Sequence, residues 1–171
     1  MATKTAYQTG HQLVCVYLND HLAGATAGLE LVRRMAASAE PGSEAAAVLN
    51  RLKAEIAADR NALIEIMTVL GIPVRGYKVF AAWAGEKAAR LKFNGRLLAR
   101  SPLSSLEETE ILRLGVDGKA AGWRTLRVLA GRDSRLDAQR LDELIAQADR
   151  QSDELETLRA TIAEQMLDDA R

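Results

Sequence analysis

Residues 49–70, LNRLKAEIAADRNALIEIMTVL, contain the pattern that decides the fold. Apolar residues recur there in steps of three and four, the spacing that places side chains on one face of an α-helix. The positions on this face are Leu49, Leu52, Ile56, Asp59, Leu63, Ile66 and Leu70. Asp59 is the single polar member. A carboxylate among core residues is costly unless it has a partner or a ligand, so the sequence predicts that Asp59 has one.

The preceding residues predict a helix from about His11 to Ser38, after a flexible tail of residues 1–11. Pro41-Gly42 ends this helix, and the second helix is expected to end at Gly71. Because the connection is short, the two helices should form an antiparallel hairpin over residues 12–71. The apolar face of the first helix contains Val14, Leu18, His21, Ala25, Gly28, Val32 and Met35.

Counting outward from the turn brings His21 level with Asp59. Each is the only polar member of its apolar face, so we expect the two side chains to meet at mid-height of the bundle. The interpretation that we favour is a structural pair that fixes the register of the helices. A metal held by His21, Glu55, Asp59 and Asp117 is the alternative. Arg60 and Lys119 could also neutralise Asp59 or Asp117.

The second half of the chain predicts a crossover helix over residues 77–97 and another helical hairpin over residues 102–168. In the helix after residue 102, three glycines predict close approach to another helix: Gly115, Gly118 and Gly122. The apolar face of the last helix contains Gln151 near its middle. Counting about the break at 131–134 brings Asp117 close to the level of Asp149.

The composition indicates one all-α domain. The chain has 171 residues, of which 48% are apolar and 4% aromatic, and it contains three prolines. A net charge of zero argues against a general nucleic-acid or membrane binder. The single cysteine, Cys15, cannot form an internal disulfide. The N-terminus lacks the basic and apolar order of a signal peptide, so we expect a cytoplasmic protein.

The crossover segment has its own signal, because basic residues and aromatic residues alternate between Arg75 and Arg100. This combination is typical of nucleic-acid binding. The interpretation that we favour is a basic amphipathic helix that packs on the acid-rich last helix, since the chain as a whole is neutral. We therefore expect no nucleic-acid partner.

Four segments resemble the helices of bacterial stress-associated ferritin-like proteins. They are residues 17–23 (YLNDHLA), residues 55–73 (ending VLGIP), residues 120–129 and residues 142–158. The resemblance implies a ferritin-like antiparallel four-helix bundle with an additional crossover helix. It also implies a polar layer at mid-height, where the active members hold a pair of iron or manganese ions.

The metal site of that family needs a Glu on one helix of each hairpin and Glu-x-x-His on the other. This chain has no Glu-x-x-His. The residues that the resemblance makes candidate ligands are His21, Glu55, Asp59, Asp117 and Asp149. The carboxylates are present in number but depart from the pattern of the family.

We therefore expect a non-enzymatic ferritin-like protein whose polar layer is structural and whose role is interaction or stress-related. It is expected to form a homodimer, and its protein partner is not identified by the sequence. The alternative is an iron- or manganese-binding protein or oxidoreductase with an altered His and carboxylate site.

Overall fold

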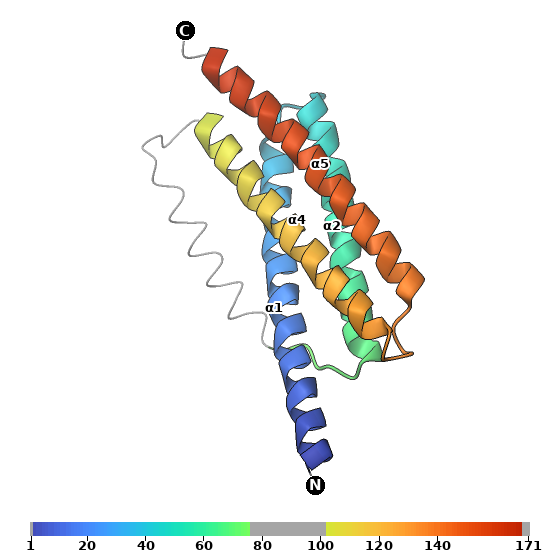
Figure 1. Ribbon diagram of the computed structural model, residues 1–171. Coiled ribbons are helices and arrows are strands. Elements are labelled where there is room, and N and C mark those ends of the chain that lie inside the picture. The colour runs from blue at the N-terminus through green and yellow to red at the C-terminus, as the bar shows by residue number, and fades with distance from the viewer. Residues whose placement is uncertain (1, 76–101, 169–171) are drawn as a thin grey trace.

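The computed structural model describes residues 2–75 and 102–168, which form four α-helices and no β-strand (Figure 1). The helices are α1 (Ala2–Ser38), α2 (Glu44–Val69), α4 (Pro102–Ala130) and α5 (Ala138–Asp168). The all-α prediction is confirmed for this part of the chain. The predicted crossover helix over residues 77–97 lies outside the described residues.

The helices form two antiparallel hairpins whose turns lie at opposite ends of the bundle (Figure 1). α1 packs against α2 and α4, and α4 packs against α5 along much of its length. α2 and α5 approach each other closely over a much shorter stretch. The side chains of Asp59, Gln147 and Gln151, which are polar, lie between α2 and α5. None of the described helices is both long and apolar enough to cross a membrane.

Local sequence signals fix the ends of α2 and the start of α5. The side chain of Ser43 accepts a hydrogen bond from the backbone N–H of Ala46 at 3.1 Å and is the N-cap of α2. At the other end, Gly71 has φ +69°, and the N–H of Ile72 donates to the carbonyl of Met67. This is a Schellman ending, which requires the left-handed conformation that glycine adopts without strain. Asp137 caps α5 by accepting hydrogen bonds from two backbone N–H groups.

α1 begins at Ala2, so the segment that the sequence predicts as a tail, residues 1–11, is helical from Ala2 onward. The segment contains no proline. Its one glycine, Gly10, costs about 1 kcal/mol of helix propensity, which is too little to end a long helix.

The apolar core consists of two clusters stacked along the bundle axis. The cluster toward the α4–α5 turn includes Leu18, Leu22, Leu63, Met67, Trp123, Leu126 and Leu144. The cluster toward the α1–α2 turn includes Leu29, Val32, Leu52, Ile56, Leu112, Val116 and Leu155. Burying each large side chain contributes roughly 1.5–3 kcal/mol. On α2, α4 and α5 the residues between the two clusters include Asp59, Lys119 and Gln151, which are polar.

Candidate functional site

Asp59 lies in the interior between the two apolar clusters, with 2% of its surface exposed. Its Oδ2 atom is 2.5 Å from Nζ of Lys119 on α4. On α5, Gln147 donates to Oδ1 at 3.0 Å and Gln151 donates to Oδ2 at 3.2 Å. Both carboxylate oxygens therefore have hydrogen-bond donors, as the burial of this charge requires.

Gln151 joins the other members of this group and is 1% exposed. Its Oε1 atom accepts a short hydrogen bond from Lys119. Its Nε2 atom donates to Oε2 of Glu55 at 2.9 Å as well as to Asp59. The orientation of this amide follows from the network, because its oxygen must face the ammonium and its nitrogen the carboxylates. We call Glu55, Asp59, Lys119, Gln147 and Gln151 the polar layer.

Lys119 supplies the positive charge of the polar layer, and its side chain is 13% exposed. Burial lowers the pKa of this lysine, because the ammonium loses water, while Asp59 and then Glu55 oppose the shift by stabilising the charge. An ammonium has three protons, enough to donate to both Asp59 and Gln151. The layer thus contains one cation and two carboxylates, joined across three helices.

His21 does not pair with Asp59, so the central contact predicted from the sequence is wrong. The half-buried imidazole packs on α4 over Gly122, where an added Cβ atom would lie 3.0 Å from the ring. The ring of Tyr17 stands edge-on to it at a centroid distance of 4.4 Å. Counting along the hairpin compares α1 with α2 only, whereas the imidazole lies against α4. α1 packs against α4 as well as α2, and the imidazole points to α4.

Among the described residues, the close approach predicted from three glycines is found only at Gly122, whose missing side chain makes room for His21; at Gly115 and Gly118 an added Cβ atom would meet nothing within 4 Å. Burial lowers the pKa of His21, and the charge of Asp20 opposes that shift. The phenol of Tyr17 donates to Oγ1 of Thr125 at 3.0 Å, so this part of α1 is tied to α4. Arg60, the other cation considered from the sequence, donates to Oγ1 of Thr26 at 3.0 Å and joins α2 to α1.

The five candidate ligands do not form one site. Glu55 and Asp59 come together, since both accept from the same nitrogen of Gln151. Asp117 instead accepts a hydrogen bond from Ser152 at 2.7 Å on an exposed surface. Asp149 forms an exposed ion pair with Arg124 at 2.6 Å. Within residues 2–75 and 102–168, no three or more His, Cys, Asp or Glu side chains group so that they could hold a metal ion.

Gln147 is the member of the polar layer that sequence reasoning missed. It lies four residues before Gln151, a spacing that places both amides on one face of α5. Two long amides at this spacing beside a core face were the available signal. Gln147 lies at the edge of the apolar stripe of α5 and is only partly buried, so the spacing that marks core positions does not include it.

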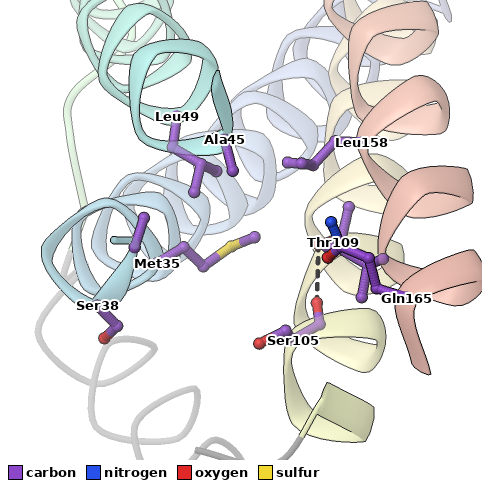
Figure 2. Close-up of a pocket in the computed structure, with 10 residues that line it drawn as sticks. Met35, Ser38, Ala45, Leu49, Ser105, Thr109, Leu158 and Gln165 are labelled. Atoms are coloured by element: carbon purple, nitrogen blue, oxygen red, sulfur yellow. Dashed lines mark hydrogen bonds between the residues drawn. The ribbon is translucent and has the colours of Figure 1, made fainter. Parts of the chain in front are cut away.

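A pocket of about 280 Å³ lies at the end of the bundle near the α1–α2 turn (Figure 2). Its walls are mostly apolar and include Met35, Leu49 and Leu158. Two of the hydroxyl groups that line it donate within their own helices, from Ser38 to the carbonyl of Arg34 and from Thr109 to the carbonyl of Ser105. These hydroxyl protons are therefore not available to orient a ligand, which makes the pocket a weaker candidate site than the polar layer.

Comparison of the chain with protein-family models, with curated proteins and with solved structures gave no match.

Proposed function

We propose that this chain is a cytoplasmic ferritin-like helical bundle without enzymatic activity, which acts by binding other proteins. The single observation that carries the proposal is the contact between Lys119 and Asp59 at 2.5 Å. A cation of the protein itself lies at the height where the resemblance to ferritin-like proteins implies metal ions. The stress-linked role implied by that resemblance is part of the proposal.

The donor set fits a structural layer better than a pair of metal ions. Both oxygens of Asp59 already accept from an ammonium and two amides. A metal cation bound beside Lys119 would be repelled by that ammonium and would have to displace these donors. Asp117 and Asp149 have other partners on the surface. The residues present therefore do not fit the dinuclear site of the family.

The alternative function is that of an iron- or manganese-binding protein or oxidoreductase. The observation in its favour is that Glu55 and Asp59 converge on one nitrogen of Gln151, at 2.9 and 3.2 Å. Two carboxylates that converge in this way are the minimum of a site for a hard or intermediate cation. We rank this function second, because Lys119 compensates the same charge.

Metal analysis separates the two functions. The protein is expressed in medium supplemented with iron or with manganese, purified without chelator, and analysed for metal per chain. We expect well under one ion per chain in both media, and oxidation of added Fe²⁺ no faster than in a buffer blank. Asp149→Asn is the matched control for adventitious binding, because it removes an exposed carboxylate.

One or two ions per chain would overturn the proposal if Glu55→Gln or Asp59→Asn lost them and Asp149→Asn retained them. Circular dichroism of each variant confirms that its helices are present. Metal that all variants bind equally would be adventitious and would leave the structural function as the conclusion.

A further inference from the structure

The outer side of α4 carries a stripe of exposed residues with little charge. They recur in steps of three and four: Ile111, Leu114, Gly118, Ala121, Thr125 and Val128. Ile111, Leu114 and Val128 are 42%, 70% and 73% exposed, although each is a large apolar residue. This spacing forms the narrow seam along which one helix packs against another. We call these six residues the α4 outer face.

The folding of the described bundle does not account for the glycine in this face. A Cβ atom added to Gly118 would have no atom within 4 Å, in contrast to Gly122, which packs under His21. Glycine in a helix costs about 1 kcal/mol relative to alanine. At Gly118 this cost is not offset by a close contact among the described residues. A missing side chain on an exposed apolar face allows the backbone of another helix to approach.

The order of residues in the α4 outer face is self-complementary for two antiparallel copies. When the helices are aligned about a two-fold axis between positions 119 and 120, Gly118 lies opposite Ala121. Leu114 then lies opposite Thr125, and Ile111 opposite Val128. The small residues meet at the centre and the large apolar residues lie outside them. Such a surface suits a closed two-fold dimer, in which one patch meets its own copy.

Charges beside the α4 outer face favour the same direction. Glu107, Glu110 and Asp117 lie in the first part of α4 and Arg124 in its last part, while Arg113 of the first part is paired with Glu156 of α5. In the antiparallel alignment Asp117 is close to the level of Arg124 of the second copy. A parallel alignment would bring acidic groups together, which is unfavourable. Arg124 remains 54% exposed in its pair with Asp149, so it is accessible to a second carboxylate.

We propose that the α4 outer face binds the same face of a second copy of this chain in an antiparallel two-fold dimer. Further apolar area lies next to it on α1, where Leu13 is exposed one turn before Tyr17. Tyr17 itself is hydrogen-bonded to Thr125 of α4, so Leu13 lies on the side of α1 that is next to this face. The proposed dimer does not depend on the role of the polar layer, because the α4 outer face and the polar layer share no residue.

Sedimentation equilibrium on the full chain over a micromolar range tests the dimer. We expect a mass of twice the 18.6 kDa chain for the wild type. Leu114→Asp and Val128→Asp should raise the dissociation constant by about tenfold or more, while helical content stays unchanged because both side chains are exposed. Val69→Asp, at an exposed valine on α2, is the matched control and should leave the mass unchanged.

Disulfide trapping tests the direction of the helices in a Cys15→Ser background. Under mild oxidation, Ile111→Cys mixed with Val128→Cys should give a cross-linked dimer, and Ile111→Cys alone should give little. Cross-linking of Ile111→Cys with itself would indicate a parallel pair and overturn the antiparallel arrangement. A wild-type mass of one chain throughout would overturn the dimer. If Leu114→Asp then also lowered the free energy of unfolding, the face would be covered by the same chain.

Discussion

Nζ of Lys119 lies 2.5 Å from Oδ2 of Asp59 and joins α4 to α2 in the interior of the bundle. Lys119 of the same chain thus compensates the charge of Asp59, which the sequence pattern places in the core. Gln147 and Gln151 of α5 also donate to Asp59, so this one carboxylate joins three helices. The stability of the fold should therefore depend strongly on which member of the polar layer is removed.

Replacing Asp59 with alanine should lower the free energy of unfolding by about 3–5 kcal/mol, because the buried ammonium of Lys119 loses the carboxylate with which it is paired. Gln147 and Gln151 also lose an acceptor. The matched control is Asp149→Ala, which breaks an exposed ion pair with Arg124 and should cost no more than about 1 kcal/mol. Urea unfolding followed by circular dichroism measures both. Similar small losses for the two variants would contradict a buried ion pair.

The double variant Asp59→Leu/Lys119→Met should recover part of the stability that Asp59→Ala loses, although Gln147 and Gln151 still lack their acceptor. Apolar groups of similar size avoid the desolvation of two charges, so such replacements are often neutral or stabilising by about 1–4 kcal/mol. A double-mutant cycle with the two single variants gives the coupling energy. A double variant whose loss equals the sum of the single losses would show that the two side chains do not interact.

Gly122→Ala and Gly115→Ala should have different effects although both exchange glycine for alanine in α4. At Gly115 the new Cβ atom meets open space, so the exchange should stabilise the helix by up to about 1 kcal/mol. At Gly122 it would lie 3.0 Å from the imidazole of His21, so the variant should be less stable than Gly115→Ala. Adding His21→Ala should remove that specific penalty. Thermal and urea unfolding compare the three proteins, and equal stabilities would contradict the close contact.

Acidification should destabilise the protein through His21. Burial lowers the pKa of this imidazole below 6.5, so the unfolded chain binds the proton more readily than the native protein. The free energy of unfolding should therefore fall as the pH decreases from 6.5 to the lowered pKa, and this contribution should be constant outside that window. His21→Gln should have a flatter profile, measured by urea unfolding at several pH values.

The helices of the described segments were largely predictable because their signals are local. Spacing of apolar residues, a serine N-cap and a glycine stop determine α2 without reference to other parts of the chain. The predicted start of α1 at about His11 is wrong, because the residues before it include no proline and a single glycine, which is too little to end a helix.

The polar layer was predictable in its height but only partly in its partners. The periodicity placed Asp59 in the core and required a compensating group, and Lys119 was among the cations considered. His21 was chosen because counting along a hairpin compares two helices only. In a bundle each helix has two neighbours, and the packing of α1 on α4 turned His21 toward Gly122. This choice depends on contacts between hairpins, which no local pattern in the sequence encodes.

The division of the core by the polar layer has a consequence for how the protein unfolds. Leu63 and Met67 belong to one apolar cluster, Leu52 and Ile56 to the other, and on α2 Asp59 lies between them. The two ends of the bundle are thus separate units of apolar packing, and we expect the contacts of Lys119 and Gln151 to couple their unfolding. Amide hydrogen exchange would show this coupling directly, because loss of these polar contacts would let one end of the bundle open while the other end stays protected from exchange.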